Sequence, residues 1–268
     1  MINKQNLPTE ARTILIGNLS TGKTTIFNKL SPKNNTLFTI PGITVTLTKG
    51  YIQVKNLKQA IIDTPGSNTI FFENEDEIIA KKLILDSPSA NIVFLANAVN
   101  LKKGFALFFH YAEFGLPMIF NINMMDEAYI KGIEIDVKKL EQLLGVEINT
   151  SIAIENNGLN SLKKKLEKFK PPSVSFKYPE IIHNYLNMAK QLIDSKLSNG
   201  ILLSYLIGEK PTKDFFKKNR DSTTLEQLDK LVENTKKLTV KNLDITLLNV
   251  YLEKAEQVFN ETVKINPV

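Results

Sequence analysis

The sequence predicts an α/β domain with a mostly parallel sheet, followed by a small all-helical domain. Segments typical of buried strands alternate with helical segments as far as about residue 170, and this alternation favours a parallel sheet with helices on both faces. A glycine-rich loop joins the first strand to the first helix. Pro171-Pro172-Ser173 then interrupts the pattern, and no later segment is typical of a strand. We therefore expect two domains, at residues 1–170 and 171–268.

The expected strands of the first domain are short apolar runs rich in β-branched residues. They cover residues 12–17, 60–63, 91–96, 117–122 and 146–148, and residues 45–54 are interpreted as two strands that meet in a hairpin near Gly50. Helices are expected at residues 24–30, 75–85, 103–114, 136–144 and 159–169, and residues 31–43 are expected to be irregular. In the second domain, apolar residues at helical spacing predict helices at 180–197, 201–207, 223–238 and 244–263.

The composition is that of an ordinary globular protein, and it narrows the chemistry. Of 268 residues, 43% are hydrophobic and 23% are charged, and none is cysteine. The lack of cysteine excludes disulfides, thiolate metal sites and cysteine nucleophiles, and it fits a reducing cytosol. No apolar run approaches the ~20 residues of a membrane-spanning helix, and the N-terminus has no apolar signal segment. The net charge of +6 is interpreted as a solvated surface, with nucleic-acid or anionic-lipid contact as the alternative.

The glycine-rich loop has the spacing of a phosphate-binding loop. Gly17-Asn-Leu-Ser-Thr-Gly22-Lys23-Thr24 fits G-x-x-x-x-G-K-[ST] and lies between an expected strand and an expected helix. Such a loop wraps backbone N–H groups around a β-phosphate, while the lysine ammonium meets phosphate oxygens and the threonine hydroxyl binds Mg²⁺. The dipole of the following helix favours the same anion. The residues expected to bind a nucleotide here are Gly17, Asn18, Ser20, Thr21, Gly22, Lys23, Thr24 and Thr25.

Two further motifs lie at the ends of later strands. Asp63-Thr-Pro-Gly66 follows the strand at 60–63, where a carboxylate can hold Mg²⁺ through water and the Gly66 N–H can meet a γ-phosphate. Asn123-Met124-Met-Asp126 follows the strand at 117–122. An aspartate there can accept hydrogen bonds from N1–H and the exocyclic amine of guanine, a pair of donors that adenine lacks. Asn123 can tie this base-binding loop to the phosphate loop.

Together these motifs predict a P-loop GTPase of the Ras-like type that binds GTP with Mg²⁺ and hydrolyses it. Lys23 and Mg²⁺ would stabilise the developing charge while a water attacks the γ-phosphate, and loss of that phosphate would relax two loops. No side chain is an obvious general base. A loop after the last strand usually contacts the base and sugar, and Ser151-Ile-Ala153 is the best candidate, through Ser151 and Ala153.

The motifs closely resemble those of the FeoB family of bacterial ferrous iron transporters. The resemblance lies in Pro41-Gly-Ile-Thr-Val45, Asp63-Thr-Pro-Gly66, Glu75-Asp-Glu77, Asn123-Met-Met-Asp-Glu-Ala128 and Lys131-Gly-Ile-Glu-Ile-Asp136. By this resemblance Thr44, rather than Thr36, Thr39, Thr46 or Thr48, completes the magnesium shell. It implies the catalytic residues Lys23, Thr44 and Gly66, and the Mg²⁺ ligands Thr24, Thr44 and Asp63.

The resemblance also implies a biological setting. The chain is expected to be the cytoplasmic GTPase domain and the helical GDP-dissociation-inhibitor domain, at the inner face of the cell membrane, and to gate Fe²⁺ uptake through a membrane permease domain. The simpler expectation is a piece of the longer transporter, and a detached soluble relative is the alternative. GTP or GDP is the expected ligand, no nucleic acid is expected, and a homo-oligomer stays open.

Ser20 and Asn97 depart from the family pattern, while Ser67 fits the family but differs from the Ras type. Ser20 stands where relatives have an asparagine that helps to hold an activating K⁺, and this argues against potassium stimulation. Ser67 follows the second motif in place of a water-orienting glutamine, which implies slow turnover. Asn97 replaces the usual aspartate.

Other polar residues are interpreted as structural. His110 and His183 lack metal-ligand partners in the sequence, and the acidic cluster at Glu73 and Glu75–Glu77 suits a helix start, so no iron site is expected. Two alternatives stay open. One is a ribosome- or RNA-associated GTPase, and the other is a nucleotide-sensing module without significant turnover.

Overall fold

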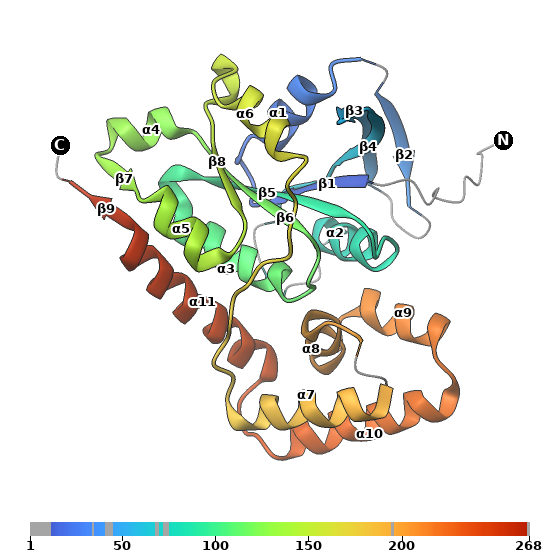
Figure 1. Cartoon of the computed structure of the whole chain (residues 1–268). Helices are drawn as coiled ribbons and strands as arrows, with labels where there is room; N and C mark the ends of the chain where they lie inside the picture. Colours follow the sequence, from blue (N-terminus) through green and yellow to red (C-terminus); the bar gives the residue numbers. More distant parts are fainter. Residues whose placement is uncertain are drawn as a thin grey trace.

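A seven-stranded, mostly parallel sheet is the centre of the first part of the chain (Figure 1). The computed structural model describes residues 12–33, 35–40, 45–67, 70–71, 75–193 and 196–266. The strand order is β2-β3-β4-β1-β5-β6-β8, with β2 and β3 antiparallel to their neighbours and the other pairs parallel. The strands are β1 (Arg12–Gly17), β2 (Thr36–Thr39), β3 (Thr46–Val54), β4 (Leu57–Asp63), β5 (Asn91–Asn97), β6 (Met118–Asn123) and β8 (Glu147–Thr150).

Helices cover both faces of the sheet, as the alternation of elements predicts. The helices of this part are α1 (Lys23–Leu30), α2 (Glu75–Leu85), α3 (Leu101–Ala112), α4 (Met125–Ile130), α5 (Val137–Leu144) and α6 (Leu159–Lys165). Successive residues of β1 point to opposite faces: Leu15 joins the core under α1 and α6, while Ile14 and Ile16 join the larger core under α2, α3 and α5. The α/β class and the parallel sheet predicted from the sequence are confirmed.

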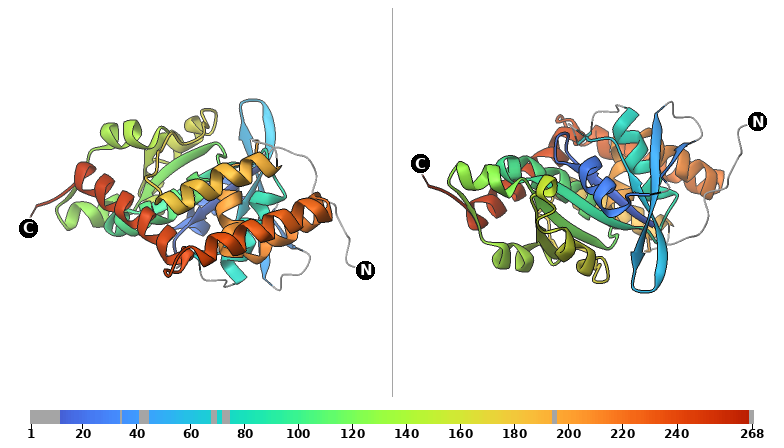
Figure 2. Two further views of the ribbon diagram at one scale, coloured as in Figure 1. Left: turned by 90° about the horizontal axis from the view of Figure 1, so that it is seen from below. Right: turned by 90° about the horizontal axis from the view of Figure 1, so that it is seen from above.

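In the described part of the chain, five helices follow the break at residues 171–173. They are α7 (Glu180–Ile193), α8 (Asn199–Ile207), α9 (Lys210–Asn219), α10 (Ser222–Lys237) and α11 (Leu243–Thr262). α7 to α10 enclose a second core with Tyr185, Leu206 and Phe216. The first turns of α11 belong to this core through Leu247, but its later turns, including Tyr251, pack into the core of the sheet beside α3. Figure 2 shows α11 extending along both parts of the chain.

The chain after residue 171 is not wholly helical. β9 (Val263–Ile265) follows α11 and pairs antiparallel with β7 (Ile133–Ile135). Each of these strands has three residues, and each forms by pairing with a partner that lies far away in the sequence. The expectation that no strand follows the break is therefore wrong.

Two further local expectations are also wrong. Residues 45–54 do not fold into a hairpin: β3 is one continuous strand, and the hairpins lie between β3 and β4 and between β2 and β3. Position 50 within β3 requires glycine, because a Cβ there would clash with the Ser31 hydroxyl. The segment expected to be irregular contains β2, and the sequence reading omits α4 and α9.

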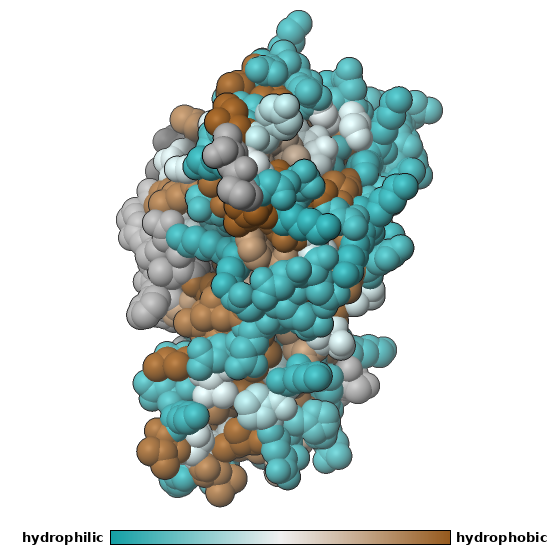
Figure 3. Space-filling model, turned by 90° about the vertical axis from the view of Figure 1, so that its left-hand side faces the viewer, coloured by the Kyte–Doolittle hydropathy of each residue, from teal (hydrophilic) through white to brown (hydrophobic). Residues whose placement is uncertain are grey.

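The surface is chemically mixed. Figure 3 views the side that carries α4 and the C-terminal end, where brown apolar patches alternate with teal hydrophilic ones. Tyr129, Ile130 and Ile265 are the strongly exposed large side chains of these elements. Among the residues that the structure describes, no helix combines the length and apolar character needed to cross a bilayer.

A buried ion pair joins the two parts of the chain. Lys81 on α2 contacts Glu209, the residue before α9, and their side chains are only 6% and 4% exposed. Lys81 also donates to the carbonyl of Ile70 at 3.4 Å. Removing one partner of such a pair leaves the other charge buried without compensation, which costs more than losing an exposed pair.

We expect Lys81→Met to lower the free energy of unfolding by about 3–5 kcal/mol, because Glu209 keeps a buried, unpaired charge. Adding Glu209→Gln should restore much of that loss. The matched control is Lys102→Met, whose ion pair with Glu256 is half exposed at 49% for each side chain. That change should cost no more than about 1 kcal/mol. Urea unfolding measures all three variants, and equal losses for Lys81→Met and Lys102→Met would contradict the prediction.

Candidate functional site

The loop between β1 and α1 forms one wall of an open hollow at the carboxyl ends of the parallel strands. The hollow has a volume of about 370 Å³ and is also lined by Thr46–Thr48 of β3 and by Asp63–Gly66. The loop turns sharply, with φ values of 57° at Ser20 and 82° at Gly22. Clefts at this edge of a parallel sheet are where α/β proteins bind ligands.

Lys23 lies inside the loop. Its side chain is 6% exposed, and its ammonium donates to the carbonyl oxygens of Gly17 at 3.1 Å and Asn18 at 2.6 Å. The Thr21 hydroxyl donates to the same Asn18 carbonyl at 2.9 Å. These bonds hold a buried positive charge beneath the loop, at the first turn of α1.

Thr24 and Asp63 meet at the floor of the hollow. The Thr24 hydroxyl donates to Asp63 Oδ2 at 2.7 Å. Asp63 Oδ1 is buried and has no hydrogen-bond partner within the described part of the chain. Burial raises the pKa of Asp63, although the hydrogen bond from Thr24 and the charge of Lys23 act in the opposite direction. A buried oxygen without a donor, beside a hydroxyl, suits a hard divalent cation such as Mg²⁺.

The Asp63–Gly66 segment closes against the phosphate-loop backbone. Ser67 N donates to the Gly17 carbonyl at 3.1 Å, and Leu19 N donates to the Ser67 carbonyl at 3.3 Å. Asn18 Nδ2 donates to the same Ser67 oxygen at 3.3 Å. A Cβ on Gly66 would lie 2.8 Å from Leu19 Cα, so only glycine allows this approach.

The side chain of Asn123 joins its own loop to the phosphate loop and to the loop at Ser151–Ala153. Its Nδ2 donates to the Thr21 carbonyl in the phosphate loop at 3.1 Å, which is the contact expected from the sequence. Its Oδ1 accepts from Ser151 Oγ and from Ala153 N, both at 3.0 Å. Gly22 makes room for this side chain, since a Cβ there would clash with Asn123 Nδ2.

Asp126 lies one turn along, near the start of α4. The chain reaches this helix through Met124, which has a φ of 64°. Asp126 Oδ1 is buried and, among the described residues, has no partner. An aspartate held next to Asn123 with an unused acceptor can recognise a pair of N–H donors.

Asn97 supports the same loop. Its Oδ1 accepts from Val99 N at 2.8 Å, while its Nδ2 donates to Met124 Sδ at 3.0 Å. An aspartate could make the first bond but has no N–H for the second. This contact accounts for the asparagine, which the sequence alone leaves unexplained.

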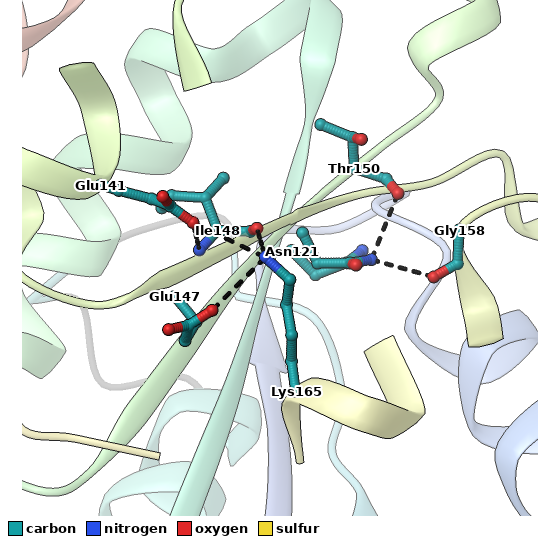
Figure 4. A network of polar contacts seen from close by, with 8 residues as sticks. Asn121, Glu141, Glu147, Ile148, Thr150, Gly158 and Lys165 are labelled. Atoms are coloured by element: carbon teal, nitrogen blue, oxygen red, sulfur yellow. Dashed lines mark hydrogen bonds and ion pairs between the residues drawn. The ribbon is translucent and has the colours of Figure 1, made fainter. Parts of the chain in front are cut away.

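Sequence reasoning missed a second set of residues, below the base-binding loop. Figure 4 shows Lys165 of α6 reaching Glu147 and the Ile148 carbonyl, while Asn121, Thr150 and Gly158 lie on a neighbouring network. The available signal was an asparagine inside an apolar strand: Asn121 is wholly buried in β6. A buried amide in a strand requires partners, but their identity depends on which strand lies alongside.

Some predicted residues do not line the hollow, and others lie outside the described residues. The described lining of the hollow does not include Gly17, Asn18, Asn123, Met124, Asp126, Ser151 or Ala153. Thr44, Glu73 and the side chains of residues 75–77 lie outside the described residues. Thr25 does line the hollow, as do the competing residues Thr46 and Thr48.

The two histidines lie away from the hollow. His110 is buried against Phe71, Phe114 and Tyr251, and burial lowers its pKa well below the usual value. His183 is exposed. Within the described part of the chain, no three His, Cys, Asp or Glu side chains gather as a metal site.

Comparison with known proteins identifies one family. The family model described as "Ferrous iron transport protein B" matches residues 11–166. The Fe(2+) transporter FeoB of Legionella pneumophila strain Paris is 30% identical over 264 residues, which cover 91% of this chain and 33% of that protein. FeoB of Leptospira biflexa is 32% identical over 160 residues, 59% of this chain and 23% of that protein. The chain thus spans about a third or less of the length of these curated relatives.

Solved structures agree with the fold. The cytosolic domain of L. pneumophila FeoB superposes with a TM-score of 0.78 at 29% identity, covering 95% of this chain and 100% of that one. A GDP-bound mutant of S. thermophilus NFeoB has a TM-score of 0.79 at 21% identity, over 95% and 100% of the two chains. This second similarity supports the P-loop GTPase-like fold alone.

We expect Asp63→Asn to raise the melting temperature of the protein without nucleotide or Mg²⁺ at pH 7. The raised pKa means that the folded state disfavours the charged carboxylate, so the penalty is present at neutral pH and fades as the pH falls towards 3.8, the ordinary pKa. The gain should therefore shrink at about pH 4. The control is Asp86→Asn at an exposed position, which should leave the melting temperature unchanged. A lower melting temperature for Asp63→Asn at pH 7 would count against the argument.

Proposed function

This chain belongs to the FeoB family of ferrous iron transport proteins, and from this premise we propose that it is a regulatory domain that binds GTP and hydrolyses it slowly. Its nucleotide state would control Fe(II) uptake through a membrane permease domain. The domain would act in the cytoplasm, at the inner face of the cell membrane, as part of a larger membrane protein. The observation that carries the proposal is the Asn123 side chain, which joins the phosphate loop to both base-binding loops.

Guanine selectivity is assigned to Asp126. Its buried Oδ1 has no partner in the described residues and suits the N1–H and exocyclic amine of guanine. Adenine offers no such pair, and leaving a buried carboxylate oxygen unpaired disfavours its binding. Asn123, Met124, Ser151 and Ala153 would shape the rest of the base and sugar pocket. The S. thermophilus relative, whose structure was solved with GDP, is consistent with this assignment.

The phosphates are assigned to residues 17–25, with the buried ammonium of Lys23 as the fixed positive charge. Thr24 and Asp63 fit Mg²⁺, which when bound supplies charge neutralisation for the β- and γ-phosphate oxygens. Thr44 is proposed as a further ligand by the family resemblance. The Gly66 N–H would meet the γ-phosphate, so GTP and GDP would hold the Asp63–Ser67 segment differently.

Slow turnover is proposed because the residue after Gly66 is serine. Its backbone bonds to Gly17 and Leu19, and its short side chain lacks the amide that orients water in faster GTPases. Ser20 likewise has no side-chain amide to hold K⁺, so we expect no potassium stimulation. The helices after residue 171 are proposed as a GDP-dissociation-inhibitor domain, which the packing of α11 against both cores supports.

The first test is titration of labelled GDP, a GTP analogue and an ATP analogue, with and without Mg²⁺, followed by phosphate release in Na⁺ and in K⁺. Guanine-selective binding with slow, potassium-indifferent release is expected. Equal binding of the ATP analogue would overturn the role of Asp126. Guanine binding without release above background would favour a nucleotide-sensing module.

We expect Lys23→Ala to weaken GDP and GTP binding by at least tenfold, because the loop loses its buried charge.

We expect Asp126→Asn to weaken GDP binding by a similar factor and to gain affinity for xanthosine diphosphate. The xanthine carbonyl replaces the amine of guanine and needs a hydrogen-bond donor, which asparagine supplies. Fluorescence titration of both variants checks this. Unchanged GTP affinity in Lys23→Ala would refute the phosphate-loop assignment.

A further inference from the structure

Two asparagines lie buried side by side beneath the base-binding loop that follows β8, at residues 151–157. Asn121 on β6 and Asn149 on β8 are direct partners across the parallel strands, and they are 0% and 2% exposed. Their neighbours Ile119 and Ile148 are core residues. Burying an amide costs free energy unless it is hydrogen-bonded, so two adjacent amides at this depth require a shared set of partners.

Asn149 fixes the donor-to-acceptor direction of these hydrogen bonds. Its Nδ2 donates to Asn121 Oδ1 at 2.7 Å and contacts the carbonyl oxygens of Thr150 at 3.2 Å and Gly158 at 3.3 Å. Because two of these acceptors are backbone carbonyls, the opposite orientation of the amide would bring oxygen against oxygen. The cost is that Asn149 Oδ1 stays buried and, among described residues, unpartnered.

The same donor-to-acceptor direction of the hydrogen bonds continues into the base-binding loop. With its Oδ1 facing Asn149, Asn121 points Nδ2 at Ser151 Oγ, 3.0 Å away. The Ser151 hydroxyl then donates to Asn123 Oδ1 at 3.0 Å. We call the four residues Asn149, Asn121, Ser151 and Asn123 the amide relay.

The amide relay ends at the phosphate loop, through the 3.1 Å bond from Asn123 Nδ2 to the Thr21 carbonyl. Its other end is the Gly158 carbonyl, just before α6. The relay therefore connects the base-binding loop to the phosphate loop through consecutive side-chain hydrogen bonds. On its outer side the base-binding loop is exposed, with Ile154 72% exposed, and one pair of backbone bonds between Ile152 and Asn157 closes it.

We propose that Asn121 and Asn149 are positioning residues that set how slowly a guanine nucleotide dissociates from this chain, an inference that rests on the proposed function. Neither side chain is part of the described lining of the hollow. They act through Ser151 and Asn123, by holding the base-binding loop against the phosphate loop. Losing that support lets the loop open outwards, which speeds release much more than it changes association.

The test is stopped-flow dissociation of labelled GDP from the full chain. Asn149→Ala should raise the dissociation rate about tenfold, since the buried contacts of its amide with Asn121 and with two backbone carbonyls are lost, while the association rate stays within about twofold. Preference for GDP over ADP should be kept because Asp126 is intact. Asn121→Ala should act alike, and the double variant should be little faster than the faster single variant, because both residues serve one relay.

The matched control is Lys165→Met, which removes contacts with Glu141 on α5 and with Glu147 and the Ile148 carbonyl on β8, the strand of Asn149. None of the described contacts of Lys165 is with a relay residue. This variant should lower the melting temperature without changing GDP dissociation. If Asn149→Ala does not fold, Ser151→Ala, which deletes only the relay hydroxyl, should still raise the dissociation rate.

The outcomes separate the two levels of inference. A wild-type chain that binds no GDP overturns the proposed function and this inference together. A wild type that binds GDP, with relay variants that fold and release it within twofold of the wild-type rate, overturns only the relay. A Lys165→Met variant that speeds release as much as Asn149→Ala also overturns it, because general loosening of β8 would then suffice.

Discussion

The arrangement of the site depends on one side chain, that of Asn123. A single amide reaches the phosphate loop with its nitrogen and the base-binding loop with its oxygen. The surrounding sequence is arranged around this position: Gly22 leaves room for the amide, and Met124 adopts a left-handed backbone so that α4 can start beside it. Asp126, about a hundred residues after Lys23 in the sequence, therefore lies near the start of α4, three residues after the side chain that contacts the phosphate loop.

The buried polar groups of the site lower the stability of the fold. Asp63 and Asp126 each hold a buried oxygen that has no partner among the described residues, and Lys23 is almost fully buried. A chain selected for stability alone would place apolar or paired groups there. The cost is reasonable if a nucleotide and a cation supply the missing partners. The apolar cores on the two faces of the sheet offset it. Among the side-chain atoms of the amide relay that the structure describes, only Asn149 Oδ1 is buried without a partner.

The helices after residue 171 are coupled to the sheet by packing as well as by chain connection. α11 contributes to both cores, and Lys81 meets Glu209 in a buried ion pair between the two parts. Phe71, four residues after Ser67, lies against His110 and Tyr251. Phe71 thus contacts α3 and α11, which hold the helices after residue 171 against the sheet.

The sequence by itself determined the features that depend on local spacing. The phosphate loop, the Asp63–Gly66 turn and the Asn123–Asp126 loop are readable because each is one short run whose residues act together, and the alternation of strands and helices predicts the sheet class. The tertiary structure decided what depends on distant partners. β7 and β9 are too short to be recognised singly. The periodicity of residues 244–263 predicts a helix of the second domain, but it cannot show that α11 packs into two cores. Asn121, Asn149 and Asn97 gained meaning only when neighbouring strands and Met124 were in place, because a buried amide is explained by its partners and a linear sequence does not say which residues those are.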